Sequence, residues 1–507
     1  MSINKRWRDH FQELLNRDSS VDESVFDKIP QLPVNAELGA EPTLGETKSS
    51  IKEMKNGKAP GVDGIPAEIF KHGGDDLALC LHQIILLILQ AEEITPDLQD
   101  TDIAKIFKNG DKLDCENYRG ISLLAIAEKI IARILANRLV PHAEGFLPES
   151  QRGFCPNRGT TYMFFTAQQL QEKCREQRQP LYMALIDLRK AFNSVNRETL
   201  WRTLAKYGCP EKFISILRPF HNGMSAWVIG SRGDSEAFKV QTGVKQGCVI
   251  APTLFSIFIP AIFHLIQVRL PDGIEIIYRM DRGLFNLRKL KARTKTAITS
   301  LIELQYANDN CICATSERQL QVILAAFTYA YESLGLSVNV KKAEVLFQHA
   351  PGQQSSPSPM SISGSTLKNV QTFPYLGSFL STKADIEAEI LHRLKVASCA
   401  FGRLRERVFE EKGLKKETKL LVYKAVVLLS LLYSSESWTT YRRHLNALEK
   451  YHQRCLRRIL GVTWQDRRTN CSILDEAHCT SIEAMITENQ LRWTGYVVRL
   501  KDSRLPK

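Results

Sequence analysis

The segment LQYANDNCICA (304–314) constrains the fold of this chain more than any other feature of the sequence. Two runs of alternating apolar residues flank a short polar turn, a pattern typical of two β-strands joined as a hairpin. We expect the turn Asn308–Asn310 to hold Asp309 at its tip, within reach of a metal ion. Its neighbour Asn308 is an uncharged amide, so the turn presents one acid where it has room for two.

A second acid ends an apolar run elsewhere in the chain. The segment LYMALID (181–187) is typical of a buried strand, and Asp187 follows three apolar residues at its end. A carboxylate in such a place needs a partner or a metal ion. One interpretation is a helix N-cap or an ion pair with Arg189. The other is that Asp187 and Asp309 converge on two divalent cations, as in nucleotidyl transfer, with Mg²⁺ favoured because it prefers oxygen ligands.

Length and composition limit the classes of protein. A chain of 507 residues is too long for one core, so several subdomains are expected. The net charge of +13 favours a polyanionic partner such as nucleic acid, the alternative being a merely basic soluble protein. The apolar segment 77–91 is too short and interrupted to span a bilayer, which predicts a core helix and no membrane anchor. The twelve cysteines form no CxxC pair, which predicts reduced thiols and an intracellular protein of the nucleus, the cytoplasm or both.

The order of the patterns predicts an α+β fold. The patterns before residue 140 are helical, apart from a break at 108–124, and strand and helix patterns then mix. Helices are predicted at 251–270 and 317–335. A Pro- and Ser-rich segment at 349–365 is typical of a loop, and the patterns beyond it are helical. Two basic segments, 278–296 and 451–468, are expected to contact phosphates, with a solvated surface as the alternative.

Several motifs between residues 50 and 440 follow one another in the order of a known family. They are APGVDGIPAEIFK, NYRGISLL, QRGFCPNRGTT, ALIDLRKAFNSVNRETLW, QGCVIAPTLFSIFI, YANDN, GLSVNVKKAEVL and FPYLGS. Each motif alone is weak, but in this order they make the chain resemble the reverse transcriptases of non-LTR (LINE-type) retrotransposons. Telomerases and group II intron proteins fit the order of the later motifs less well.

The resemblance implies the site residue by residue. Asp187, with the backbone of Leu188, and Asp309 are expected to hold two Mg²⁺ ions, or Mn²⁺, with Asn308 beside them in the catalytic turn. Phe192 matches the residue that excludes a ribose 2′-OH, core packing being the alternative. The nucleotide is expected to contact Phe192, Gln246, Gly247 and Lys342, and the primer end to be held by Phe373, Tyr375, Leu376 and Gly377. The implied partners are an RNA template, a DNA primer and dNTPs.

The chain departs from the family pattern at two positions. Asn308 stands where the family has the first Asp of the hairpin, and Asn193 stands where it has Asp after the Phe192 position. Losing even a residue that supports a metal ligand costs about 10–100-fold, so losing a charged ligand is expected to cost more. We therefore expect an RNA-directed DNA polymerase with weak or lost activity, and the alternative is a non-catalytic nucleic-acid-binding relic of a retroelement.

The resemblance also implies a right-hand polymerase arrangement with helical fingers, a palm and a helical thumb. The expected parts are a connector at 1–50, fingers with an N-terminal extension at 51–180, the palm at 181–348, the primer grip and thumb at 349–440, and a C-terminal helical region at 441–507. Because residues 1–50 are too few for an endonuclease, we expect the N-terminal endonuclease of such elements to be absent.

Overall fold

The computed structural model of the protein describes residues 3–17, 21–151, 153–156, 158–230, 233–267, 270–279, 296–353 and 357–500. Its centre is a five-stranded sheet with the strand order β13-β10-β3-β9-β8. β3 pairs antiparallel with β9 and β10, and β8 and β9 form a hairpin. The strands are β3 (Leu181–Asp187), β8 (Glu303–Tyr306), β9 (Asp309–Ala314), β10 (Glu344–Gln348) and β13 (Lys368–Val370).

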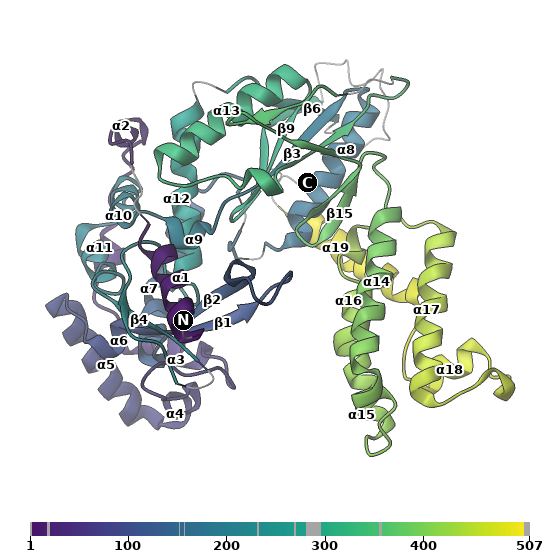
Figure 1. Cartoon of the computed structure of the whole chain (residues 1–507), viewed down its shortest axis with the longest axis horizontal. Helices are drawn as coiled ribbons and strands as arrows, with labels where there is room; N and C mark the ends of the chain where they lie inside the picture. Colours follow the sequence, from purple (N-terminus) through teal and green to yellow (C-terminus); the bar gives the residue numbers. More distant parts are fainter. Residues whose placement is uncertain are drawn as a thin grey trace.

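Helices cover both faces of this sheet (Figure 1). Alternate residues of β3 enter two hydrophobic clusters: Met183 packs with α8 (Thr160–Glu176), and Ala184 packs with α12 (Ala251–Ile266) and α13 (Glu317–Ser333). Because both faces are covered, every residue of β3 up to Ile186 can be apolar. The structure confirms the predicted strand at 181–187 and the two predicted helices, which end four and two residues earlier than expected.

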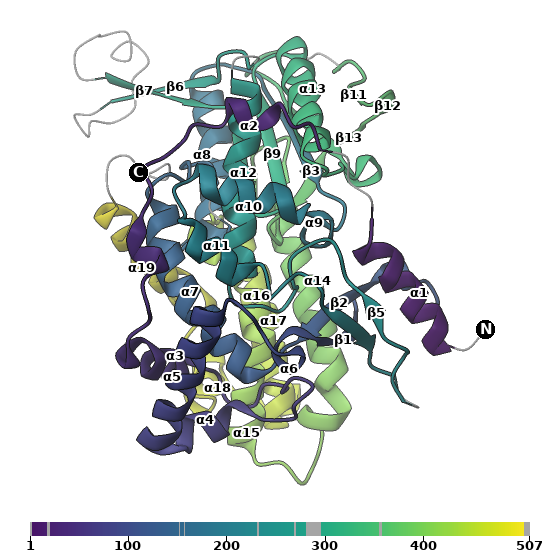
Figure 2. The ribbon, with the colours of Figure 1, turned by 90° about the vertical axis from the view of Figure 1, so that its left-hand side faces the viewer.

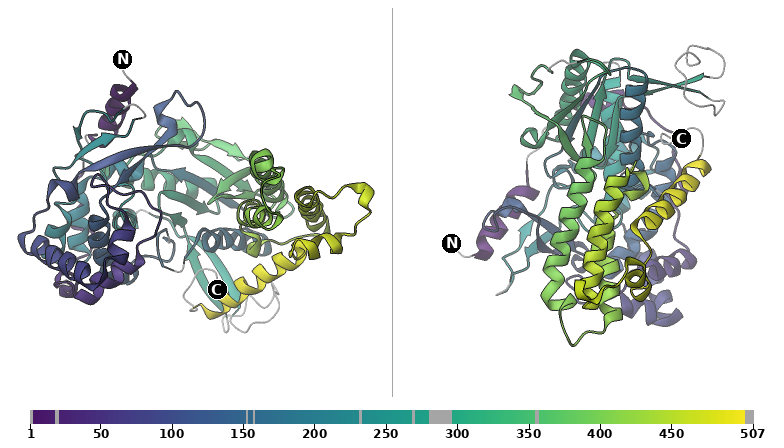
Figure 3. Two further views of the ribbon diagram at one scale, coloured as in Figure 1. Left: turned by 90° about the horizontal axis from the view of Figure 1, so that it is seen from below. Right: turned by 90° about the vertical axis from the view of Figure 1, so that its right-hand side faces the viewer.

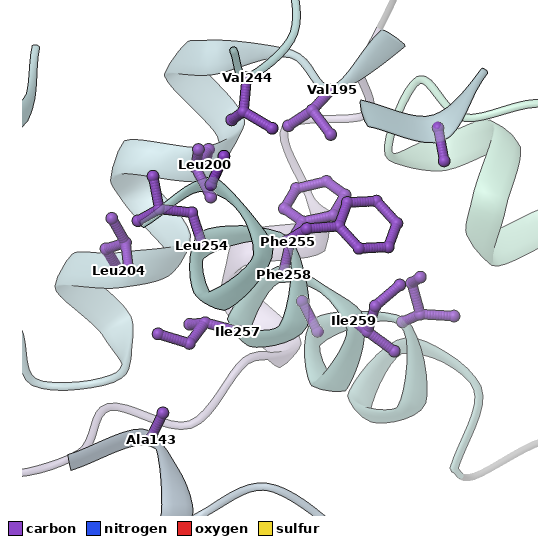
Figure 4. Packing of buried hydrophobic residues seen from close by; sticks show 14 of the residues in the cluster. Ala143, Val195, Leu200, Leu204, Val244, Leu254, Phe255, Ile257, Phe258 and Ile259 are labelled. Atoms are coloured by element: carbon purple, nitrogen blue, oxygen red, sulfur yellow. The ribbon is translucent and has the colours of Figure 1, made fainter. Parts of the chain in front are cut away.

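Helix α12 is the centre of the larger cluster. It lies among α7 (Ile126–Glu144), α10 (Arg197–Lys206) and α13, and nearly all of its side chains are buried. Figure 4 shows its aromatic and aliphatic side chains packed against those of the neighbouring segments; the labelled residues are Ala143, Val195, Leu200, Leu204, Val244, Leu254, Phe255, Ile257, Phe258 and Ile259.

The region before residue 140 differs from the expectation of helices alone. β1 (Thr101–Phe107) and β2 (Tyr118–Leu123) form an antiparallel pair, and β1 also pairs in parallel with β4 (Ser225–Val228). β4 pairs in turn with β5 (Phe238–Lys239), which completes a four-stranded sheet. The helical expectation for this region is therefore wrong in part, because pairing with a strand more than 100 residues away leaves no local period in the sequence.

Further helices of the N-terminal half lie on the side of the molecule that carries this second sheet (Figures 1 and 2). They are α1 (Ile3–Leu15), α2 (Val25–Lys28), α3 (Leu44–Glu53), α4 (Ala67–His72), α5 (Gly74–Ala91), α6 (Pro96–Gln99), α9 (Ala191–Ser194) and α11 (Glu211–Leu217). Figure 2 also shows β6 (Ile274–Arg279) and β7 (Thr296–Leu301) projecting as a hairpin. Most of the basic segment 278–296 lies outside the described residues.

The predicted core helix at 77–91 is a surface helix. In α5, Leu81 and Ile85 are buried, whereas Ile84 and Leu87 are 51% and 65% exposed. Among the described helices, α5 is the one that is long and apolar enough to cross a membrane by length and composition. The expectation of a core helix is wrong for the exposed side of α5, because α3 and α4 cover only the other side.

The C-terminal part forms a separate hydrophobic cluster from Ile386 to Ile486. Its helices lie side by side on the side of the molecule opposite to α3–α7 (Figures 1 and 3). They are α14 (Glu387–Leu404), α15 (Lys416–Val422), α16 (Leu429–Leu431), α17 (Arg442–Leu460), α18 (Asn470–Glu476) and α19 (Ile482–Arg499). Two short hairpins precede them, β11 (Ser361–Ile362) with β12 (Ser365–Thr366) and β14 (Thr372–Tyr375) with β15 (Ser378–Ser381).

Candidate active site

The β8–β9 turn lies one step earlier in the chain than we expected. Tyr306 pairs with Asp309, so the two turn residues are Ala307 and Asn308, and Asp309 is the first residue of β9. Ala307 has a φ of 57°, in the left-handed region that tight two-residue hairpins require. The expectation that Asp309 occupies the tip is therefore wrong: Asn308 occupies it, and Asp309 lies at the start of the strand.

The register of the sheet brings the two acids together. Asp187, the last residue of β3, lies directly opposite Asp309 on β9. Residues that are opposite each other in an antiparallel pair point to the same face of the sheet. The strand positions two residues away, Leu185 and Cys311, pack in the cluster beneath α8, which identifies that face. The structure thus brings together, at one end of the two inner strands β3 and β9, the two carboxylates that the sequence analysis singled out.

Asp187 receives a hydrogen-bond donor on each of its oxygens. The Nδ2 of Asn308 donates to Oδ1 over 3.1 Å, and the Nζ of Lys342 lies 3.3 Å from Oδ2. Lys342 ends a short 3₁₀ turn, Val340–Lys342, that leads into β10. The amide at position 308 therefore directs an N–H group at the carboxylate, where an aspartate would add a third acid to the site.

The carboxylate of Asp309 is only partly compensated by nearby positive charge. The pKa of Asp309 is raised to about 6, chiefly by burial and also by the nearby Asp187 carboxylate, while Lys342 acts in the opposite direction. A cation between the two carboxylates would relieve this cost. The donor set nevertheless holds only two acids: among the described residues, no group of three or more His, Cys, Asp or Glu side chains is gathered as a metal site.

The backbone carbonyl of Leu188 lies on the side of β3 that faces β9 and the two acids. Its side chain is 3% exposed and packs in the core. The carbonyl of Asp187 accepts from the N–H of Asn339 over 2.8 Å, and the N–H of Arg189 donates to Ser337 over 2.9 Å. Neighbouring residues of an antiparallel strand alternate their hydrogen-bonding groups between the two edges. The carbonyl of Leu188 is therefore on the β9 edge, on the side of the acidic pair.

Phe192 lies in α9, immediately after the strand that carries Asp187. Its ring is half-buried, stacks on Phe255 with a centroid distance of 4.7 Å and meets the Phe154 ring edge-on at 5.9 Å. Its carbonyl accepts from the N–H of Val244 over 2.8 Å. The ring thus packs partly in the core and is partly exposed. Both alternatives from the sequence analysis, core packing and contact with the sugar of a nucleotide, therefore fit its position.

Gln246 and Gly247 belong to the loop before α12. The carbonyl of Gln246 accepts from the N–H of Ser122 over 2.7 Å, which ties the loop to β2. Gly247 is exposed and has a φ of 128°, and a Cβ there would lie 2.5 Å from the carbonyl oxygen of Ser122. Only glycine fits at this approach of two backbones.

Two buried cations that sequence reasoning missed anchor this loop. The guanidinium of Arg197 donates to the carbonyls of Gly243 over 2.9 Å and Val240 over 3.1 Å. The Nζ of Lys245 lies 2.8 Å from the Glu128 carboxylate, and both side chains are about 1% exposed. Burial raises the pKa of Glu128 against the opposing effect of Lys245. A charged residue within an apolar helix pattern, as Glu128 is, is the sequence signal that could have identified this pair.

The four residues expected at the primer end form the β14–β15 hairpin, but they differ in exposure. Phe373 and Tyr375 are fully buried, and the Tyr375 hydroxyl donates to the carbonyl of Leu304 on β8 over 3.2 Å. Leu376 and Gly377 form the turn with φ values of 51° and 84°. The hairpin is thus attached to β8 by its buried aromatic residues, while Leu376 in the turn is half-buried and Gly377 is exposed.

Further cations gather around Lys108, which is itself near Asp187. Burial lowers the pKa of Lys108, and the charges of Arg119, Lys342 and Lys190 lower it further, while Asp187 acts in the opposite direction. Lys108 directly follows β1 and Arg119 lies in β2, in the stretch where sequence reasoning had expected a break between helices. Their convergence depends on how the two sheets lie together, so the sequence carried no local signal for it.

A buried acid lies behind the hairpin. Glu303 is 1% exposed, and its carboxyl oxygens accept from the Nδ2 of Asn310 over 3.0 Å and the hydroxyl of Ser150 over 3.3 Å. The same Nδ2 lies 2.9 Å from the hydroxyl of Tyr331 on α13. Burial raises the pKa of Glu303 to about 8. The network holds β8, β9 and α13 together. In the sequence, the glutamate Glu303 within an apolar strand pattern is the signal that could have indicated this network.

Glycine also supports the turn from below. A Cβ at Gly153 would lie 2.2 Å from the backbone nitrogen of Ala307, so this position admits no side chain. The Gly153 carbonyl accepts from the hydroxyl of Ser256 on α12 over 2.9 Å. The segment before α8 therefore packs directly against the turn that carries Asn308.

Comparison with known proteins extends over this whole region. Residues 106–380, just over half of the chain, match the family described as reverse transcriptase (RNA-dependent DNA polymerase). The chain is 25% identical over 454 residues to the "RNA-directed DNA polymerase from mobile element jockey" of Drosophila funebris, covering 86% of this chain and 46% of that protein. It is also 25% identical over 426 residues to the "Retrovirus-related Pol polyprotein from type-1 retrotransposable element R2" of Popillia japonica, covering 82% and 54%. The chain spans about half the length of these relatives.

Proposed function

Because this chain belongs to the reverse transcriptase (RNA-dependent DNA polymerase) family, we propose that it is the polymerase part of a non-LTR retrotransposon and that Asn308 impairs its nucleotidyl transfer. The observation that carries the second half of the proposal is the hydrogen bond from Asn308 Nδ2 to Asp187. An N–H group directed at a metal-binding carboxylate competes with the cation for its oxygen. The template, primer and dNTP substrates are part of the proposal.

The proposed right-hand arrangement uses the expected boundaries. The strands β3, β8, β9 and β10 with α12 and α13 would be the palm at 181–348, which α8 covers, and the β1–β2 pair with α4–α8 would be the fingers at 51–180. The helices from α14 onward would be the thumb and the C-terminal region, divided at residue 440. The hydrophobic cluster that continues from Ile386 to Ile486 supports one packed helical unit on both sides of that boundary.

Asp187, Asp309 and the carbonyl of Leu188 would hold the divalent cation, because they are the oxygen groups gathered where β3 ends and β9 begins. When bound, a pair of Mg²⁺ ions supplies activation of the primer hydroxyl and stabilisation of the leaving pyrophosphate. The raised pKa of Asp309 fits a carboxylate that is made to face a cation. With Asn308 in place of an acid, the second ion would have one charged ligand fewer, which supports weak or lost activity.

The cations near Asp187 would bind the triphosphate of the nucleotide. Lys108, Arg119, Lys190 and Lys342 approach one place from three separate elements, as the effects of their charges on Lys108 indicate. The half-buried ring of Phe192 and the glycine backbone at Gly247 would bound the sugar and base. The exposed turn of the β14–β15 hairpin would contact the primer end, with Phe373 and Tyr375 fixing its position from the core.

A second candidate function is nucleic-acid binding without catalysis, in the nucleus or the cytoplasm. The specific observation in its favour is again the pair of donors, Asn308 and Lys342, on Asp187. These contacts satisfy the carboxylate without a metal ion. Such a protein would bind primed template in the absence of Mg²⁺ and incorporate no nucleotide.

Primer extension on an RNA template tests the proposal. We expect Asn308→Asp to extend a DNA primer in Mg²⁺ at least about 100-fold faster than the natural chain, because losing a mere supporting partner already costs about 10–100-fold. Asn193→Asp is the matched control: it makes the same chemical change at the other departure, and it should have the smaller effect. Equal extension by the natural chain and Asn308→Asp would contradict the impairment, and extension by neither would favour the binding function.

A further inference from the structure

The outer face of helix α17 carries a row of cationic side chains. Arg443, Lys450, Arg454 and Arg458 follow one another at intervals of seven, four and four residues, and all four are exposed. These intervals place them on one face of the helix. The row is about 22 Å long at a rise of about 1.5 Å per residue. The whole helix has six Lys and Arg residues against a single acid.

The charge of this row is only partly compensated. The acid, Glu449, is occupied internally, because its carboxylate accepts from the N–H of Ile482 over 2.8 Å and from the Nε2 of Gln453 over 2.9 Å. Within the part of the chain that the structure describes, no carboxylate forms a salt bridge with Lys450 or Arg454. The members at the ends of the row are paired at the surface, Arg443 with Glu387 and Arg458 with Glu410.

The row borders a groove rather than an apolar surface. A groove of about 660 Å³ runs along α17 and is lined by Lys450, Arg454 and Arg458. The opposite face of the helix, with Leu448 and Leu456, is fully buried in the C-terminal cluster. A helix that binds a membrane inserts its apolar face into the lipid. Since the apolar face of α17 is already used, the surface fits a soluble polyanion better than a lipid bilayer.

An exposed aromatic side chain follows the row. Trp464 is 84% exposed and lies in the segment that connects α17 to α18. That segment is fastened to the last turn of α17, because the Nη2 of Arg457 donates over 2.9 Å both to the carbonyl of Arg468 and to the Oδ1 of Asn470. An indole of this exposure contributes nothing to the core. Its position beyond the cations suits stacking against an unpaired base.

This surface is separate from the site that contains Asp187. In Figures 1 and 3, α14 and α16 lie between α17 and the N-terminal helices, so α17 is on the outer side of the helical unit. The residues of the row take no part in the network around Asp187 and Asp309. A ligand on α17 would therefore not compete for the catalytic residues.

We propose that the outer face of α17, with Trp464, is a second nucleic-acid site that binds single-stranded nucleic acid. The cations supply phosphate contacts without sequence readout. The exposed indole supplies base stacking, which a duplex does not offer along its length. The proposal does not depend on the polymerase activity, since none of these residues belongs to the catalytic sheet.

Fluorescence anisotropy of a labelled 12-nucleotide oligouridylate with the full chain tests the site over a range of salt concentrations. The double variant Lys450→Gln with Arg454→Gln should make the fall of log K with log salt less steep by about 1.4, since each phosphate contact to a single strand contributes about 0.7 to this slope. Trp464→Ala should weaken binding at least about fivefold. The double variant Lys28→Gln with Lys212→Gln removes two exposed charges on the N-terminal side and should change neither quantity.

Photo-crosslinking of a 4-thiouridine form of the same oligonucleotide localises the contact, and the expected crosslinks fall within residues 442–470. An unchanged slope and affinity in the α17 variants would overturn the proposal, and so would crosslinks confined to other segments. If the α17 variants lose binding to a blunt duplex but keep binding to the single strand, the single-strand assignment is wrong. If the α17 variants lose binding to vesicles of anionic phospholipid but keep binding to the oligonucleotide, the surface binds lipid instead. Thermal melting of each variant checks that the fold is retained.

Discussion

Replacing Glu303 by glutamine should change how the stability of the β8–β9 hairpin depends on pH. Glu303 is 1% exposed behind β9, and burial raises its pKa from the ordinary value of 4.5 to about 8. The folded chain therefore binds this proton more tightly than the unfolded chain does. The stability that the protonated acid contributes is fully present below pH 4.5 and is lost as the pH rises to about 8.

The magnitude follows from the two pKa values. One pKa unit corresponds to about 1.36 kcal/mol, so the wild-type hairpin should lose about 3 kcal/mol between pH 5 and pH 8 through this group alone. Glutamine has nearly the same shape and offers the donor and the acceptor that the protonated acid offers. We expect Glu303→Gln to be close to the wild type at pH 5 and clearly more stable at pH 8.

Hydrogen exchange of the β9 amides, read by mass spectrometry, measures the free energy of opening of this unit. Wild type and Glu303→Gln are compared at each pH, so that the intrinsic exchange rate cancels. Glu332→Gln is the matched control, because Glu332 is exposed on α13, the helix that contacts the same network. Parallel pH profiles for wild type and Glu303→Gln would refute the reasoning, since a carboxyl that stays ionised in the folded chain produces no such difference.

Three further changes test other parts of the site. Lys245→Met leaves the carboxylate of Glu128 buried without its counter-charge, so urea titration should show a loss of about 3–5 kcal/mol in the free energy of unfolding, and Glu128→Gln added to it should recover part. Gly153→Ala would place a methyl group 2.2 Å from the backbone of the β8–β9 turn, so hydrogen exchange in β9 should become faster. Lys342→Met removes a charge that lowers the pKa of Asp309, so the midpoint of Mn²⁺ binding, followed by electron paramagnetic resonance, should move to higher pH; an unchanged midpoint would contradict the assigned contact.

Local patterns in the sequence determined the main elements around the site. The apolar run that ends at Asp187 is a strand covered on both faces, and the alternation at 304–314 is a hairpin. The helices at 251–266 and 317–333 were visible for the same reason, since a period of two or of 3.6 is set by residues that are neighbours in the chain. The convergence of Asp187 and Asp309 could therefore be anticipated from two acids at strand ends.

Tertiary structure alone decided what surrounds these acids. The strand β1 lies in a region that appeared helical in the sequence, because its partner β4 is more than 100 residues away and leaves no local trace. The placement of Lys108 near both Arg119 and Asp187, and the burial of Glu303 behind β9, depend on the same kind of distant packing. Sequence alone identified Asn308 as an amide in place of an acid. Only the pairing of β3 with β9 directs that amide to donate to Asp187, because a hydrogen bond between residues 121 positions apart is set by the register of the sheet.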